Sequence, residues 1–141
     1  MEITLKGDSE IENIPSLKQK ALRINLNEHI YGTFAEIGAG QETVRQFFRA
    51  GGASRTIAKS MSAYDKDFSD AIYGIEDDKR YVTESRLRKM LSHEIKLIEE
   101  RITRDKHPNK MFFAYANTVT TIDFAKKFKG HGWVGIKYQI D

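Results

Sequence analysis

The chain has 141 residues, which is enough for one domain built around one hydrophobic core. It contains no cysteine, so disulfides, thiolate nucleophiles and cysteine-bound metal centres are excluded, and its net charge of +3 does not by itself indicate a nucleic-acid partner. No run approaches the ~20 apolar residues of a membrane helix, and the first ten residues lack the pattern of an export signal. We therefore expect a cytoplasmic protein.

The predicted elements alternate between helices and strands along the chain. Hydrophobic periodicity, β-propensity and turn residues give their bounds. In chain order they are a polar leader over 1–15, a helix over 17–24 capped by Ser16, a strand over 30–37, a helix over 41–50, an element over 54–64 that fits a strand or a helix almost equally, an irregular or short helical connection over 67–81, a helix over 84–104 capped by Thr83, a strand over 111–122, a loop or a short helix and loop over 123–132, and a strand over 133–140.

This order predicts an α/β or α+β fold in which helices cover a small sheet. The helix over 84–104 has the clearest pattern, because apolar residues recur every three or four positions while charges fill its other faces. We expect residues 16–141 to form a single domain that is part of a longer protein or assembles as a homo-oligomer.

The run "TFAEIGAGQETV", residues 33–44, places a Gly-Ala-Gly turn between a strand and a helix. Free backbone N–H groups and the helix dipole attract an anion in this geometry, and glycine lets a phosphate approach the backbone. The hypothesis is a phosphate-bearing small molecule or nucleotide at Gly38, Ala39 and Gly40, with positive charge from Arg45 and Arg49. The alternatives are a turn that only reverses the chain and a solvated arginine face.

The segment "EIGAG" also matches the first motif of Rossmann-like methyltransferases that bind S-adenosylmethionine. That similarity implies that Glu36, Gly38 and Gly40 form the motif and that Asp65 takes the ribose hydroxyls. Glu42 stands at the third glycine position of the longer fingerprint, and the rest of the chain has too few strands for a complete methyltransferase sheet. A methyltransferase-like half-domain is therefore a further alternative.

A nucleic-acid-associated module is the alternative from another class. The segment "DFAKKFKGHGW" combines cations with rings that stack on bases, the chemistry of single-strand binding. An amphipathic turn with solvated lysines has the same spacing. The residues that would contact nucleic acid are Lys126, Lys127, Lys129, His131 and Trp133.

No complete catalytic or metal-binding motif is present in the sequence. The pair His93-Glu94 lacks the second histidine of the zinc metallopeptidase motif, since position 97 is leucine, and the G-x-S-x-G elbow of serine hydrolases does not occur. Whether the protein is an enzyme, and which cofactor it uses, stay open, and no metal ligands are proposed.

The runs "ALRINLNEHIYGTFAEIGAGQETVRQFFRAGG", "SAYDKDFSDAIYG" and "GHGWVGIKYQ" resemble the N-terminal region of a family of longer, uncharacterised bacterial cytoplasmic proteins. Some members carry the labels TonB-dependent receptor or nicotinamide-nucleotide adenylyltransferase. The first label requires an export signal and many alternating strands, and the second requires an H-x-G-H motif where this chain has Gly130-His131-Gly132. We adopt neither label.

Overall fold

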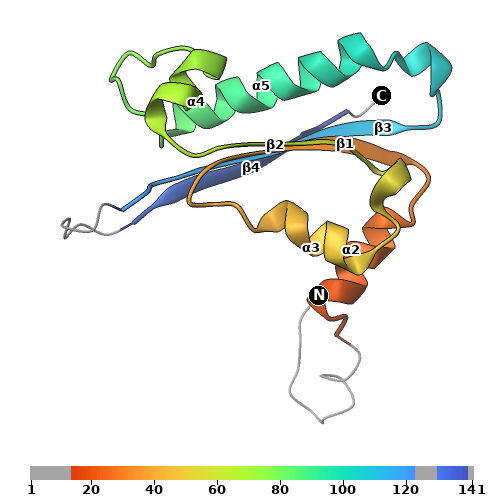
Figure 1. The fold of residues 1–141 in the computed structure, drawn as a ribbon. Coiled ribbons are helices and arrows are strands. Elements are labelled where there is room, and N and C mark those ends of the chain that lie inside the picture. The colour runs from red at the N-terminus through yellow and green to blue at the C-terminus, as the bar shows by residue number, and fades with distance from the viewer. Residues whose placement is uncertain (1–13, 123–129, 140–141) are drawn as a thin grey trace.

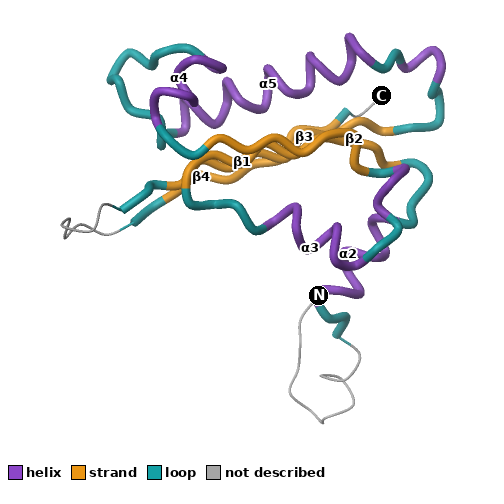
Figure 2. Tube along the Cα trace, viewed as in Figure 1, coloured by secondary structure: helices purple, strands orange, loops and turns teal. Residues whose placement is uncertain are grey.

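The computed structural model describes residues 14–122 and 130–139, and it has helices on both faces of one sheet (Figures 1 and 2). Its elements, in chain order, are α2 (Leu17–Asn25), β1 (Ile30–Gly38), α3 (Thr43–Ala50), β2 (Ile57–Ala63), α4 (Lys66–Tyr73), α5 (Glu84–Arg101), β3 (Met111–Val119) and β4 (Gly132–Tyr138), with single 3-10 turns at Ala53–Arg55 and Arg104–Lys106. The predicted α/β class is confirmed. The leader up to residue 13 and most of the loop over 123–132 lie outside the described residues.

The four strands have the order β2-β1-β3-β4. Strand β1 is parallel to both β2 and β3, and β4 runs antiparallel to β3 at one edge. Helices α4 and α5 cover one face of this sheet and α2 and α3 cover the other (Figure 1). The carboxyl ends of the three parallel strands β1, β2 and β3 therefore lie at the same end of the sheet.

Helix α5 forms the core with β3, as its periodicity predicts. Its buried residues include Leu87, Met90, Ile95 and Ile98, and the β3 residues packed among them include Phe112, which is fully buried. The hydroxyl of Thr83 accepts a hydrogen bond from the amide of Arg86, so the predicted cap is confirmed. Within the described residues, no helix is long and apolar enough to cross a membrane.

The ambiguous element over 54–64 is the strand β2. Its pairing with β1 shifts by one residue between Gly32 and Thr33, which is a bulge. A bulge reverses the face to which the following side chains point, so Ile57 lines a cavity on the α3 side whereas Lys59 reaches Glu94 of α5. The connection over 67–81 was predicted to be irregular or a short helix, and its first part is the short helix α4.

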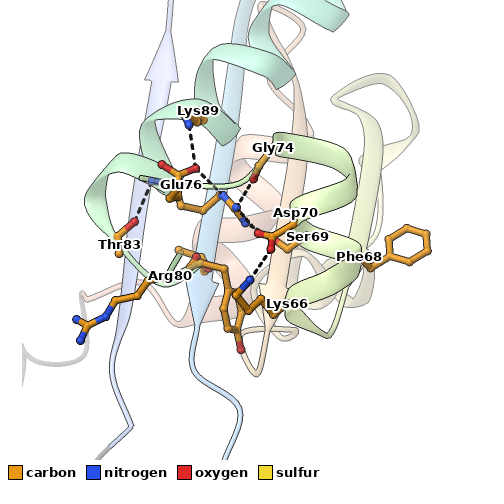
Figure 3. A network of polar contacts seen from close by, with 12 residues as sticks. Lys66, Phe68, Ser69, Asp70, Gly74, Glu76, Arg80, Thr83 and Lys89 are labelled. Carbon is orange, nitrogen blue, oxygen red and sulfur yellow. Dashed lines mark hydrogen bonds and ion pairs between the residues drawn. The ribbon is translucent and has the colours of Figure 1, made fainter. Parts of the chain in front are cut away.

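A buried ion network joins α4, the following loop and α5 (Figure 3). The guanidinium of Arg86 is fully buried, and its nitrogens lie 2.7 Å from Asp70 Oδ1 and 3.1 Å from Glu76 Oε2. Arg86 also donates to the Ser69 hydroxyl and, over 2.6 Å, to the Gly74 carbonyl. This network fixes the start of α5 against α4.

Both carboxylates of this network stay ionised despite their burial. Burial opposes ionisation of Asp70, but hydrogen bonds and charge from Lys66 and Arg86 outweigh it and lower the pKa of Asp70. Burial also opposes ionisation of Glu76, but hydrogen bonds from Ser85, Arg86 and Lys89 lower its pKa.

Candidate functional site

The Gly38–Gly40 turn lies at the carboxyl end of β1, beside the carboxyl end of β3, where Gly38 pairs with Val119. Open α/β sheets bind ligands beyond the carboxyl ends of their strands. The sequence-predicted residues Glu36, Gly38, Ala39 and Gly40 therefore come together where a ligand site is expected. What they bind there is decided by their hydrogen bonds.

The side chain of Glu36, a buried residue of β1, caps the N-terminus of α3. Its side chain is 1% exposed, and Oε1 accepts a hydrogen bond from the amide of Val44 at 2.9 Å. Oε2 accepts from the amide of Thr43 at 3.2 Å and from Asn117 Nδ2 at 3.3 Å. Because Glu42, at the N-cap position, gives no side-chain cap, the carboxylate of Glu36 stands where an external anion would bind.

The turn itself is also hydrogen-bonded internally. The amide of Ala39 donates to the carbonyl of Val119 at 3.2 Å. The side-chain amide of Gln41 donates to the carbonyls of Gly38 at 2.8 Å and of Glu36 at 3.1 Å. The premise that the amides after Ile37 are free is therefore wrong for Ala39, and by the contacts of Glu36 it is wrong for Thr43 and Val44.

Packing within the fold is sufficient to require the two glycines. A β-carbon on Gly38, whose φ is +75°, would lie 1.9 Å from the carbonyl oxygen of Val119. One on Gly40 would lie 2.6 Å from Asn117 Oδ1. The glycines were predicted to let a ligand approach the backbone, and in the structure it is strand β3 that lies against them.

The other predicted phosphate ligands lie on α3. Arg45 and Arg49 are one helical turn apart and both are exposed. Neither forms an ion pair within 14–122 and 130–139. Phosphate binding by these two arginines stays a prediction.

Asp65, the second acid of the methyltransferase hypothesis, caps α4. Its Oδ1 accepts a hydrogen bond from the amide of Phe68 at 2.9 Å. This contact explains why an acidic residue follows β2 without reference to a cofactor, because an aspartate at the N-cap satisfies an unpaired helix amide. Binding of S-adenosylmethionine by Glu36 and Asp65 stays a prediction.

The nucleic-acid hypothesis falls only in part on the described residues. Lys126, Lys127 and Lys129 lie outside them. His131 pairs with Thr120 through its backbone, with the amide of Thr120 donating to the His131 carbonyl at 2.9 Å. Trp133, on the edge strand β4, is 41% exposed, so its ring is accessible.

An aromatic cavity of about 300 Å³ lies between the sheet and the layer of α2 and α3. The ring of Phe34 is central to its wall, at centroid distances of 5.1 Å from Phe47, 5.2 Å from Tyr115 and 5.7 Å from Phe113. Ile136 and Tyr138 of β4 also line the cavity, and they are 59% and 53% exposed. The cavity is therefore bordered by exposed apolar side chains at the edge of the sheet.

Behind the apolar surface of this aromatic cavity, a hydrogen-bonded pair connects two of its lining residues to the turn. The hydroxyls of Thr43 and Tyr115 lie 2.9 Å apart, and the Tyr115 hydroxyl accepts a hydrogen bond from Asn117 Nδ2 at 3.2 Å. Asn117 also contacts Glu36. The internally capped turn thus positions Thr43 and Tyr115 rather than presenting free amides.

A second hollow, of about 390 Å³, lies between α5 and strands β1 and β2. Glu94 is 1% exposed there, where it forms an ion pair with Lys59 and accepts a hydrogen bond from the Tyr73 hydroxyl at 2.8 Å. Burial, followed by the charge and hydrogen bond of Glu94, raises the pKa of Tyr73 well above its usual range. Sequence reasoning missed this group because only the bulge in β2 turns Lys59 toward α5.

No protein-family model and no curated protein matches the chain. Solved structures with a similar fold include competence/damage-inducible protein CihA from Agrobacterium tumefaciens, with a TM-score of 0.54 and 17% identity over 74% of this chain and 62% of that one. A competence-damaged protein (CinA) superfamily protein from Enterobacter cloacae has a TM-score of 0.50 and 15% identity over 82% of this chain and 65% of that one. A competence or damage-inducible protein from Enterobacter asburiae has a TM-score of 0.51 and 12% identity over 86% and 84%.

These similarities establish the fold and nothing further, because the identities are 12–17%. The chain spans less than two thirds of the length of the first two neighbours. The three neighbours are bacterial competence- or damage-related proteins, and they do not support the receptor and adenylyltransferase labels.

Proposed function

We propose that this domain binds a small molecule with an aromatic ring in the aromatic cavity between α3 and the sheet. The observation that supports this proposal is a cavity of about 300 Å³ with an apolar surface and aromatic walls, behind which lies the hydroxyl pair of Thr43 and Tyr115. Ligand sites in proteins are typically apolar hollows of about this size with a few polar groups that orient the ligand. Nucleosides and nucleotides are the class to test first, since their bases are flat and carry hydrogen-bonding edges.

For a nucleotide, we propose that Arg45 and Arg49 hold the phosphate. Both arginines lie on the exposed face of α3, about 200° around the helix from the cavity residues Thr43 and Phe47, so they would meet a phosphate that extends past the helix to solvent. The carboxylate of Glu36 would repel a phosphate at the N-terminus of α3, whereas exposed guanidinium groups match phosphate oxygens without that repulsion. The prediction of a phosphate-bearing ligand is thereby kept, with its charge contacts on the exposed side of the helix.

The proposal is tested by isothermal titration with adenosine, AMP and S-adenosylmethionine. Ile136→Trp should obstruct the aromatic cavity and weaken binding at least tenfold, because the larger ring would fill space that the ligand needs. Val134→Trp is the matched control, since Val134 lies two residues earlier on the same face of β4, is 62% exposed and does not line the cavity. Arg45→Gln with Arg49→Gln should weaken AMP binding and leave adenosine binding unchanged.

Three outcomes would count against parts of this proposal. Absence of binding by all three compounds at millimolar concentration would reject this ligand class. Equal effects of Ile136→Trp and Val134→Trp would reject the cavity as the site. Binding of S-adenosylmethionine that is lost in Asp65→Asn and unaffected by Ile136→Trp would favour the methyltransferase-like alternative instead.

A nucleic-acid-associated role is the second candidate, and the exposed ring of Trp133 is the observation that favours it. Aromatic rings next to cations bind single strands through base stacking. The three lysines before Gly130 would supply the charge. Fluorescence of the single tryptophan gives a direct readout of this candidate.

A further inference from the structure

A basic hollow lies at the amino ends of β1 and β3, at the opposite end of these strands from the turn. It consists of two adjoining hollows, of about 450 Å³ and 380 Å³, that share His29, Pro108, Asn109 and Lys110. Arg55 and Lys106 line the larger one as well. Three separate segments of the chain therefore contribute basic side chains to one concave surface.

Among the described residues, cations outnumber acids in the lining of the larger part of this basic hollow. Its larger part is lined by the cations Arg55, Lys106 and Lys110 and by one acid, Glu28. In the described part of the chain, none of these three cations forms an ion pair. The ammonium of Lys110 donates to the backbone carbonyl of Glu28 at 3.0 Å, a contact that holds the side chain without neutralising it.

Hydrogen bonds hold the walls of the basic hollow in place. The amide of Met111 donates to the carbonyl of His29 at 2.6 Å, and His29 Nδ1 lies 3.0 Å from the carbonyl of Asn109. The amide of Lys110 donates to the carbonyl of His107 at 3.1 Å. A site that is preformed loses less conformational freedom when a ligand binds.

We infer that the basic hollow binds a small polyphosphate group, either inorganic or as part of a nucleoside triphosphate. Several cations around one hollow favour a ligand with several negative charges close together, and phosphate oxygens accept hydrogen bonds from ammonium, guanidinium and imidazole donors. The volume matches a small molecule, whereas a nucleic-acid strand needs an extended basic groove. This site adjoins the aromatic cavity at Met111, but the cations Arg55, Lys106 and Lys110 do not line that cavity.

The test uses the full chain and sodium tripolyphosphate, measured by isothermal titration at low ionic strength. Arg55→Gln and Lys106→Gln should each weaken binding about fivefold, the upper range for an exposed ion pair, and binding should weaken as salt is added. Glu28→Gln should strengthen binding because it removes the acid that lines the larger part of the hollow. Lys96→Gln is the matched control, since the Lys96 side chain lies on α5 and is 77% exposed.

Each outcome decides the inference. No heat of binding at low ionic strength, or equal losses in Lys96→Gln and Lys106→Gln, would overturn it. Binding of a single-stranded oligonucleotide through Arg55 and Lys106 without binding of tripolyphosphate would also overturn it, in favour of a nucleic-acid surface. ATP that binds no more tightly than tripolyphosphate would identify the phosphates as the recognised group. Ile136→Trp should leave tripolyphosphate binding unchanged, so this test and the test of the aromatic cavity fail independently.

Discussion

Replacement of Arg86 by methionine should strongly destabilise the protein. The side chain is fully buried, and its removal would leave Asp70 and Glu76 with only the more exposed Lys66 and Lys89 as charged partners. Removing one partner of a buried ion pair costs about 3–5 kcal/mol, because the remaining charge stays desolvated. For a chain of 141 residues, that loss corresponds to a fall of about 10–17 °C in the melting temperature.

Arg88→Met is the control for this change. Arg88 lies two residues later on the same helix and pairs with Glu84 at 2.8 Å, but its side chain is 75% exposed. An exposed pair of this kind contributes little, so its loss should be close to experimental error. Urea unfolding of both variants, followed by circular dichroism, gives the two free energies. A loss in Arg86→Met that is no larger than the loss in Arg88→Met would refute the role assigned to the buried network.

The wild type and Arg86→Met should differ in how their free energy of unfolding depends on acidic pH. Asp70 and Glu76 have pKa values below their ordinary values of 3.8 and 4.5 in the folded protein. Each therefore contributes stability that is present above its ordinary value and is lost as the pH falls through the lowered folded value. The free energy of unfolding of the wild type should fall below about pH 4.5, and Arg86→Met should have a flatter curve there. Parallel curves for the two proteins would contradict this coupling.

Three further predictions concern the turn and the β4 edge. Gly40→Ala should destabilise the protein by about 1–3 kcal/mol, because its β-carbon would lie 2.6 Å from Asn117 Oδ1. Gly130→Ala should be close to neutral in the same urea titration, because its β-carbon would lie 3.4 Å and 3.5 Å from its nearest neighbours. Glu36→Ala should cost more stability than Glu36→Gln, since glutamine keeps an acceptor for the amides of α3, and equal losses would show that the carboxylate contributes only charge. Oligonucleotides should quench Trp133 fluorescence at low salt, and a flat titration would eliminate the nucleic-acid alternative.

The elements that sequence reasoning predicted well are those in which local pattern and burial agree. Apolar residues at Leu87, Ile95 and Ile98 recur with helical spacing, and all three are buried against the sheet. Thr83 caps the helix that its position predicts. Strand β3 was predictable because aromatic and β-branched residues without proline or glycine favour a buried strand. One physical rule was enough for each of these elements.

The element over 54–64 could not be assigned because its periodicity is interrupted by tertiary structure. A regular strand would place Ile57 and Lys59 on the same face, but the bulge opposite Gly32 and Thr33 places them on opposite faces. Exposure still alternates along the strand, but alternation alone does not show on which face of the sheet each side chain lies. The consequence extends to function, since the ion pair of Lys59 with Glu94 depends on that bulge.

Arg86 was missed for a different physical reason. Within the helical pattern over 84–104, a single arginine is interpreted as part of the charged face. Its partners Asp70 and Glu76 lie in a segment with no clean periodicity. Burial of this residue depends on four acceptors converging from α4 and the following loop, namely Ser69, Asp70, Gly74 and Glu76. Long-range convergence of this kind leaves no local signal in the sequence.

The turn motif was located correctly, and in the structure a carboxylate of the chain itself contacts the helix amides that an external anion was predicted to bind. A strand, two glycines and a helix N-terminus predict that a negative charge will sit on the first amides of α3, and a negative charge does sit there, supplied by Glu36. Sequence spacing does not distinguish a carboxylate within the chain from a phosphate outside it, because both satisfy the same amides. Since Glu36 precedes the turn on the strand face that points toward α3, it reaches those amides without any ligand. The search for ligands should therefore be directed at the aromatic cavity and the basic hollow.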